Sequence, residues 1–116
     1  MKTVNCIGSC LVDILLSPVA SYPEPKICTN IFVDKLKSSP GGGATNCSLS
    51  LAKMGVNVHL FSKIGNDLQG DYLQEELKVA GVKTKKSLRK TDKKSTSTVI
   101  VGVNLDGERS FMSYHG

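Results

Sequence analysis

The sequence predicts an α/β fold in which a parallel sheet alternates with helices and a second, smaller sheet stands beside it. In the middle of the chain, apolar runs with the period of a strand alternate with amphipathic segments of helical period, which is typical of a parallel α/β unit. Near the C-terminal end, an Asp-Gly pair joins two β-rich runs, as in a hairpin outside that alternation. The 116 residues, 40% of them hydrophobic, are enough for one domain.

The first third of the chain contains three strand-like segments. Thr3–Gly8 has the pattern of a buried strand, and a second apolar run, Leu11–Leu16, is interrupted by Asp13. Residues 17–26 hold three of the four prolines and predict a loop. Residues 28–36 alternate like a strand, and the Ser-Ser-Pro-Gly-Gly-Gly run that follows predicts a break.

Two helices and a strand follow the glycines. A helix is expected from Ala44, with Gly55 as its C-terminal cap, and residues 56–64 return to strand alternation. After a turn at residues 65–67, a second amphipathic helix runs from Leu68 to Ala80.

The last elements are a basic stretch and a hairpin. Much of the net charge of +5 lies between Lys83 and Lys94. This stretch has no aromatic residue to stack on bases and no nucleic-acid motif, so we expect a solvated loop and no nucleic-acid partner. Strands are expected at residues 96–104 and 109–115, joined by the Asp-Gly turn.

The cysteine pattern and the hydropathy of the sequence indicate where in the cell the protein would lie. The four cysteines form no CxxC pair and have no His cluster beside them, so neither a zinc site nor another metal site is expected. Reduced thiols in a cytoplasmic protein are the simplest interpretation. No apolar run approaches the ~20 residues that span a bilayer, and the N-terminus lacks a signal-peptide pattern. We therefore expect a soluble protein with no membrane partner.

The glycine run Gly41–Gly43 leads into a helix and invites comparison with phosphate-binding loops. It lacks the Lys of a P-loop, and it lies too far from the first strand for a dinucleotide fingerprint. Glycines would let the backbone approach a ligand closely, and Asn46 in the first helical turn could donate and accept hydrogen bonds. From the motif alone, a ligand site and a tight turn supported by Asn46 are equally good interpretations.

The spacing around this turn resembles the first signature of the PfkB/ribokinase family of carbohydrate kinases, G-G-x-[GAP]-x-N-x-[STA]-x6-G-x9-G. Every fixed position is matched, from Gly41 and Asn46 through Gly55 to Gly65. Residues 8–13, 65–70 and 97–111 also resemble, in order, the family's opening motif, its G-D-D-x-x-G turn and its lid strands. The resemblance implies the N-terminal part of a ribokinase-like three-layer α/β/α fold, with residues 11–16, 28–36, 96–104 and 109–115 as strands of a small β-sheet lid.

The resemblance also implies a substrate site and a reaction. Asp13 would bind two sugar hydroxyls, Gly41 and Gly42 would offer backbone contacts, and Asn46 would bind a further hydroxyl. The parent kinase would transfer phosphate from ATP, with Mg²⁺, to a sugar hydroxyl. Ribokinase proper has Asn in place of Leu11 and Lys in place of Gly43, which puts ribose itself in doubt and leaves a different sugar or a nucleoside open as the substrate. The roles of Met112, Tyr114 and His115, which fall near the family's sugar pocket, are also left open.

The motifs that carry the family's chemistry do not occur in these residues. No aspartate begins a D-T-x-G-A-G-D motif and there is no N-x-x-E motif, so we expect no catalytic, ATP-binding or Mg²⁺-binding residue and no phosphoryl transfer by this chain alone. A truncated kinase and a short non-catalytic α/β module that binds a sugar or a partner are both conceivable, and the ending favours truncation. We also expect a homo-oligomer formed through the lid strands or an exposed sheet edge.

Overall fold

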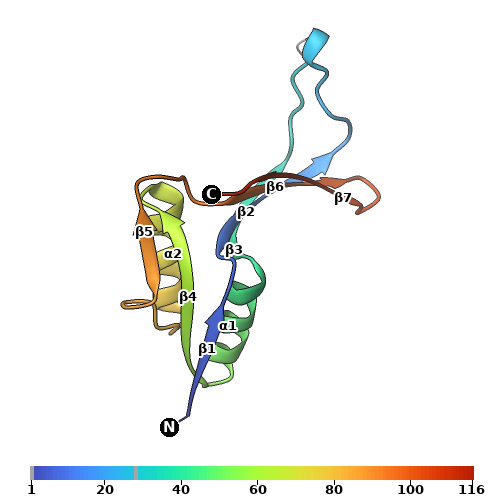
Figure 1. Ribbon diagram of the computed structural model, residues 1–116. Coiled ribbons are helices and arrows are strands. Elements are labelled where there is room, and N and C mark those ends of the chain that lie inside the picture. Colours follow the sequence, from blue (N-terminus) through green and yellow to red (C-terminus); the bar gives the residue numbers. More distant parts are fainter. Residues whose placement is uncertain (1, 28) are drawn as a thin grey trace.

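The computed structural model describes residues 2–27 and 29–116 as an α/β unit from which a second sheet projects (Figure 1). The α/β unit contains a parallel three-stranded sheet in the order β1-β4-β5. Its elements in chain order are β1 (Thr3–Ile7), α1 (Gly43–Lys53), β4 (Asn57–Gly65), α2 (Leu68–Val79) and β5 (Leu88–Thr91).

The buried core of this unit follows the two periodicities of the sequence. Val58 and Leu60 alternate along β4 and are fully buried, while Leu73 and Leu77, one helical turn apart on α2, are also fully buried. Asp67 caps α2 by accepting a hydrogen bond from the Gly70 N–H at 2.8 Å. The buried leucines hold α2 against the sheet.

Both helices lie on one face of the sheet. The strand order β1-β4-β5 advances in a single direction, and two right-handed crossovers in the same direction place their helices on the same side. On the other face, Ile7 lies opposite Phe61 and is 79% exposed. The described residues thus form two layers of the expected three-layer arrangement, and the predicted α/β class with a small lid sheet is confirmed.

The projecting sheet, which we call the lid, has the strand order β3-β2-β6-β7. The parallel pair β2–β6 lies at its centre, and the outer pairs β2–β3 and β6–β7 are antiparallel. The molecule measures 57 × 33 × 19 Å, and its radius of gyration of 16.2 Å exceeds the ~13 Å of a compact domain of this length. The lid strands are β2 (Leu11–Val19), β3 (Lys35–Gly41), β6 (Thr98–Asn104) and β7 (Arg109–Tyr114).

The expectation of a lid strand at residues 28–36 is wrong. Cys28 lies outside the described residues, residues 29–34 form no strand, and β3 instead runs from Lys35 through Pro40 to Gly41. The predicted break therefore falls inside a strand. Pairing with β2 overrides the local turn signals, and Pro40 is tolerated because β3 is an edge strand that need not donate outward. Its partner β2 is also longer than predicted and continues to Val19.

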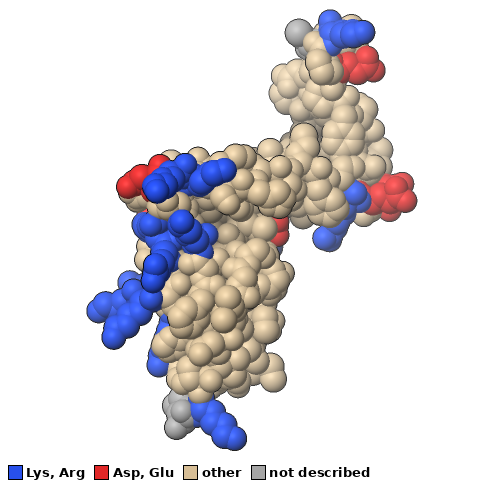
Figure 2. All heavy atoms as spheres, in the orientation of Figure 1, with Lys and Arg blue, Asp and Glu red and all other residues tan. Residues whose placement is uncertain are grey.

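The expectation that Lys83–Lys94 is only a solvated loop is wrong in part. Residues 88–91 form β5, which pairs in parallel with β4, and Leu88 is buried in the core. The Lys and Arg side chains of this stretch are exposed and gather along the β5 side of the molecule (Figure 2). Charged side chains on an edge strand discourage pairing with another chain.

The remaining expectations can be compared briefly with the structure. The predicted hairpin is present, since β6 and β7 pair from Thr98–Tyr114 to Val103–Arg109. Cys6, Cys10 and Cys47 are free thiols. Within residues 2–27 and 29–116, no helix has the length and apolar character needed to cross a membrane.

Candidate functional site

The Asp13 carboxylate lies against the backbone of Gly41. Asp13 sits on β2, and β3 runs antiparallel beside it, so that Leu11 pairs with Gly41 and Asp13 with Ser39. A Cβ atom at Gly41 would overlap Oδ2 of Asp13 and would lie 2.8 Å from its Cγ. Glycine is therefore required here for close packing, because any side chain would take the place of the carboxylate.

The environment of Asp13 makes it a plausible ligand group. Burial raises the pKa of this half-buried carboxyl above its ordinary value. Among residues 2–27 and 29–116, no hydrogen-bond or ion-pair partner compensates for the lost hydration. A ligand that donates hydroxyl hydrogen bonds would offset this cost.

The glycine turn next to Asp13 is held by Ser9. Gly42, the N-cap of α1, has φ 96°, and a Cβ there would lie 2.5 Å from the Ser9 carbonyl oxygen. The Gly43 N–H donates to Ser9 Oγ at 3.2 Å, and Thr45 Oγ1 donates to the Ser9 carbonyl at 3.2 Å. The β1–β2 turn therefore clamps the start of α1.

Asn46 lies one helical turn beyond the N-cap, with its backbone N–H donating to the Gly42 carbonyl at 2.9 Å. This is the first hydrogen bond of the helix, and the Asn46 residue is exposed to solvent. The structure thus places the Asp13 carboxylate against Gly41, the last residue of β3. Gly42 follows as the N-cap of α1, and Asn46 lies in the first turns of that helix. We call these four residues the half-site.

The lid register divides the C-terminal residues between two faces. Ser113 pairs with Val99, which pairs with Asp13, so these three side chains share one face of the lid. Met112 and Tyr114 alternate with Ser113 and point to the opposite face. His115 instead lines an open cavity of about 620 Å³ near the C-terminal ends of β1 and β4.

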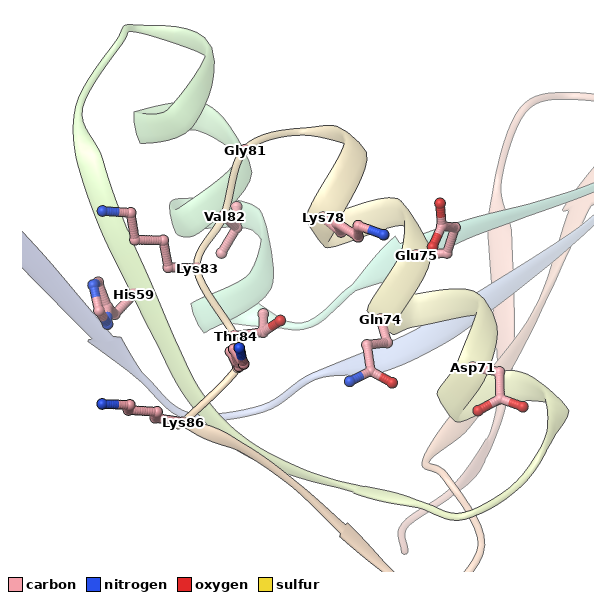
Figure 3. A pocket seen from close by; sticks show the side chains of 11 residues that line it. His59, Asp71, Gln74, Glu75, Lys78, Gly81, Val82, Lys83, Thr84 and Lys86 are labelled. Atoms are coloured by element: carbon pink, nitrogen blue, oxygen red, sulfur yellow. The ribbon is translucent and has the colours of Figure 1, made fainter.

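A larger hollow in the described part of the chain lies elsewhere. It measures about 950 Å³, runs along α2 and residues 81–86, and contains none of the half-site residues. Its charged side chains do not converge: Lys83 and His59 lie on one side of the segment, and Glu75 and Lys78 on the other (Figure 3). We assign no site to it.

Sequence reasoning missed Ser9 and Thr45. Thr45 is fully buried, which the helical pattern alone did not suggest, because a threonine in a first turn usually faces solvent. A serine in the turn before β2 and a threonine two residues beyond the last glycine were the available signals.

Comparison with known proteins identifies the family. The model of the pfkB family carbohydrate kinases matches residues 1–116. The chain belongs to the pfkB family. Among curated pfkB-type relatives, it is 33% identical over 112 residues to the putative sugar kinase PH1459 of Pyrococcus horikoshii, covering 96% of this chain and 33% of that protein. It is 36% identical over 111 residues to a fructokinase of Vibrio alginolyticus, covering 96% of this chain and 31% of the relative.

Solved structures of pfkB-type kinases have the same fold. The fructokinase of Xylella fastidiosa with bound ATP superimposes with a TM-score of 0.77 at 29% identity, covering 98% of this chain and 33% of that one. The Pyrococcus horikoshii PH1459 structure superimposes with a TM-score of 0.75 at 29% identity, covering 97% and 34%. The chain therefore spans about a third of the length of its relatives.

In the part of the chain that the structure describes, no three His, Cys, Asp or Glu side chains lie close enough together to hold a metal ion. The glycine turn at α1 carries no lysine that could reach a triphosphate.

Proposed function

We propose that this chain supplies the sugar-binding half-site and the lid of an ATP-dependent carbohydrate kinase. The observation that carries the proposal is the Asp13 carboxylate, half-buried and without a partner among the described residues, packed on a glycine that admits no side chain. Asn46 and the N-terminal turn of α1 follow directly. Membership of a carbohydrate kinase family supports this assignment.

The half-site suits a neutral ligand with several hydroxyl groups. The ionised Asp13 carboxylate can accept hydrogen bonds from two adjacent hydroxyls, and such charge-assisted bonds are stronger than neutral ones. The Asn46 amide can both donate and accept hydrogen bonds. Gly41 leaves room for the Asp13 carboxylate, and Gly42 leaves room for the Ser9 carbonyl oxygen. The half-site would therefore bind the sugar and fix its orientation.

The transfer of phosphate is assigned to residues outside these 116. ATP and Mg²⁺ in the parent kinase would supply the phosphoryl group and neutralise its charge. Asp13 is committed to the substrate in this scheme and is not proposed as the base. We expect the 116-residue chain to bind sugar but not to phosphorylate it.

The half-site supports a class of ligand, sugars and nucleosides, and not one particular sugar. Relatives include a ribokinase of Bacillus subtilis and a nucleoside kinase of Methanocaldococcus jannaschii, in addition to fructokinases. Leu11 lies beside Gly41, so an apolar side chain borders the half-site where ribokinase proper has Asn. A sugar or nucleoside that has no hydroxyl group facing the Leu11 side chain would fit the half-site best.

Calorimetric titration tests the proposal. D-ribose, D-fructose and adenosine are titrated into the wild-type chain and into Asp13→Ala. At least one ligand should bind the wild type, and its affinity should fall at least tenfold in the variant, as expected when a charged hydrogen-bond partner is lost. Binding that is unchanged in Asp13→Ala removes Asp13 from the site. Phosphorylation by the 116-residue chain with ATP would contradict its expected inactivity.

We also propose that the chain self-associates through the lid or the exposed sheet. Leu36 of the lid strand β3 is 69% exposed, Phe32 in the segment before β3 is 86% exposed, and Ile7 lies on the uncovered face of the α/β sheet. Apolar surface of this kind favours association. The cytoplasmic location stays a prediction.

A further inference from the structure

The lid is joined to the α/β unit by three chain connections. Residues 8–10 link β1 to β2, Gly42 alone links β3 to α1, and residues 92–97 link β5 to β6. The first two meet at the half-site and contain glycines with positive φ, Gly8 and Gly42. Short connections that contain glycine do little by themselves to fix the orientation of the lid relative to the α/β unit, so other contacts must hold the lid.

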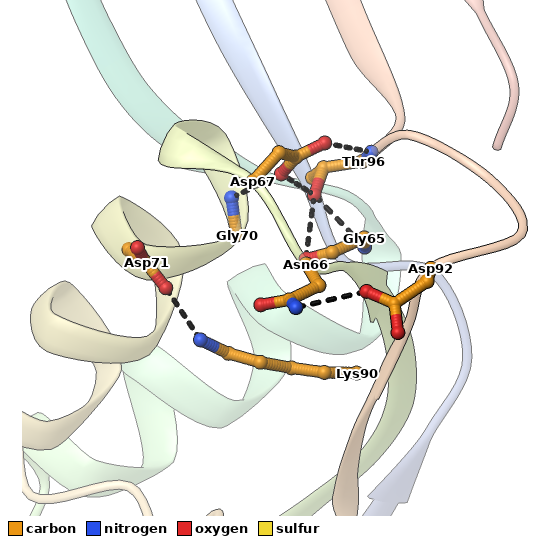
Figure 4. Close-up of polar contacts among 8 residues, drawn as sticks. All are labelled: Gly65, Asn66, Asp67, Gly70, Asp71, Lys90, Asp92 and Thr96. Carbon is orange, nitrogen blue, oxygen red and sulfur yellow. Dashed lines mark hydrogen bonds and ion pairs between the residues drawn. The ribbon is translucent and has the colours of Figure 1, made fainter.

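One support is a compact polar joint between Asp67 and Thr96 (Figure 4). Thr96, which is 3% exposed, donates to Asp67 Oδ2 through its N–H at 2.8 Å and to Oδ1 through its hydroxyl at 2.6 Å. The Gly65 N–H donates in turn to the Thr96 hydroxyl oxygen at 2.9 Å. Thr96 lies two residues before β6, so this joint fixes the start of β6 on the N-cap of α2.

A second support lies on the same helix. The Tyr72 hydroxyl donates to the Ser38 carbonyl oxygen of β3 at 3.0 Å. The Tyr72 ring and Ile14 of β2 both pack against the main core. Burial, with Glu76 nearby, raises the pKa of Tyr72, so the hydroxyl stays protonated and able to donate.

The two supports hold the strands on either side of β2. Asp67 holds β6 and Tyr72 holds β3, while β2, which carries Asp13, pairs with both. Asp13 itself pairs with Ser39 on one side and with Val99 on the other. A displacement of β3 or β6 relative to α2 would carry β2 with it and would therefore move the Asp13 carboxylate relative to α1 and Asn46.

We propose that Asp67 and Tyr72 are positioning residues. Through their hydrogen bonds, the first turns of α2 hold the lid in place and so fix Asp13 in the half-site. The claim about Asp13 rests on the proposed function. The claim about the lid rests on the hydrogen bonds alone and can be tested without a sugar.

The test uses two pairs of matched variants of the 116-residue chain. Tyr72→Phe removes only the hydroxyl that reaches β3. Its control, Tyr22→Phe, removes a hydroxyl that contacts Asn104 within the lid. Thr96→Val removes the hydroxyl of the joint, while Thr98→Val removes one that donates only to the nearby Thr96 carbonyl. Thr96→Ser restores the hydroxyl and should behave as the wild type.

Amide hydrogen exchange of the two sheets is the first measurement. In Tyr72→Phe and Thr96→Val, the lid amides of β2, β3 and β6 should exchange about fivefold faster, as expected for the loss of one hydrogen bond between the lid and α2. Amides of β1 and β4 should keep their wild-type rates, as should all amides in the control variants. Equal acceleration in both sheets, or no acceleration, overturns the proposal.

Affinity for D-fructose and D-ribose is the second measurement. For whichever sugar binds the wild type, the dissociation constant should rise about two- to fivefold in Tyr72→Phe and Thr96→Val. It should not change in the controls. Faster lid exchange with unchanged sugar affinity refutes the role of Asp67 and Tyr72 in positioning Asp13. If the wild type binds neither sugar, these sugars are excluded as ligands of the proposed function, and the exchange pattern alone decides whether α2 seats the lid.

Discussion

At the residue scale, the central feature is the contact between the Asp13 carboxylate and the side-chain-free backbone of Gly41. The chain offers a matched test two residues away. A Cβ at Gly41 overlaps the carboxylate, whereas a Cβ at Gly43 meets no atom within 4 Å. Gly43 is also the first residue of α1, where alanine favours the helix more than glycine does.

We therefore predict opposite results for Gly41→Ala and Gly43→Ala. Gly41→Ala should displace the Asp13 carboxylate and weaken sugar binding at least tenfold in a calorimetric titration. Gly43→Ala should leave affinity unchanged and stability equal or slightly higher, by up to about 1 kcal/mol. Equal effects of the two variants would show that the space at Gly41 has no special role.

Asp67 is the second residue whose role can be measured. In Asp67→Asn, the amide oxygen can still accept from Gly70, but the new NH₂ group faces the Thr96 N–H, so two donors oppose each other. We predict a loss of about 1–3 kcal/mol in the free energy of unfolding, measured by urea denaturation. An unchanged value would mean that the joint relaxes without cost.

The two aspartates should also give opposite pH dependences. Burial tends to raise the pKa of Asp67, but the hydrogen bonds from Thr96 and Gly70 and the charge of Lys90 outweigh it and hold the pKa below its ordinary value. Its stabilisation is complete above the ordinary Asp pKa of about 3.9 and is lost as pH falls through the lower folded value. The stability difference between wild type and Asp67→Asn should therefore shrink in acid. A constant difference from pH 2 to 7 would contradict this.

The contribution of Asp13 to stability depends on pH in the opposite direction. Its pKa is raised by burial, so the folded chain binds this proton more tightly than the unfolded chain. Ionisation of Asp13 therefore lowers stability as pH rises from the ordinary value through the raised one. Asp13→Asn should remove that loss, in the same urea experiments.

At the element scale, the sequence predicted those elements whose own pattern decides their structure. The helix expected from Ala44 begins at Gly43, and the one expected from Leu68 to Ala80 ends at Val79. In β4, alternation of Val58 and Leu60 with polar neighbours was sufficient. These segments have strong periodicity and clear caps, so local and tertiary preferences agree.

The elements that were missed depend on partners far away in the sequence. β3 crosses a Ser-Ser-Pro-Gly run because β2 is available to pair with it, and β5 forms in a basic stretch because β4 has an open edge. The half-site shows the same limit. Asp13 was visible as a carboxylate in an apolar run, but its contact with Gly41 and the Ser9 clamp depend on strand register, which the sequence does not reveal.

Helix α2 provides a stability test at this scale. Leu73 is fully buried against the sheet, while Leu68 on the same helix is 83% exposed. Leu73→Ala should cost about 2–5 kcal/mol in the free energy of unfolding, because it leaves a cavity. Leu68→Ala should change it by less than about 0.5 kcal/mol. Similar costs in urea denaturation would mean that α2 does not pack as described.

At the scale of the whole molecule, the elongated shape leaves one face of the parallel sheet and much of the lid uncovered. We predict reversible self-association, detectable by sedimentation equilibrium as a mass that rises with concentration. Leu36→Ser should reduce the self-association if the lid mediates the contact, and Ile7→Ser should reduce it if the sheet face does. A single monomeric species at high concentration would contradict the prediction.

A sugar bound by Asp13 and Gly41–Asn46 together should perturb the backbone of these residues. This can be measured by chemical-shift mapping of the amides of the wild-type chain during titration with D-fructose, D-ribose and adenosine. Saturable shifts are expected for at least one ligand, concentrated at Asp13 and at residues 41–46, and absent from residues 81–86. Saturable shifts confined to other residues, or no saturable shift with any of the three ligands, would contradict this expectation.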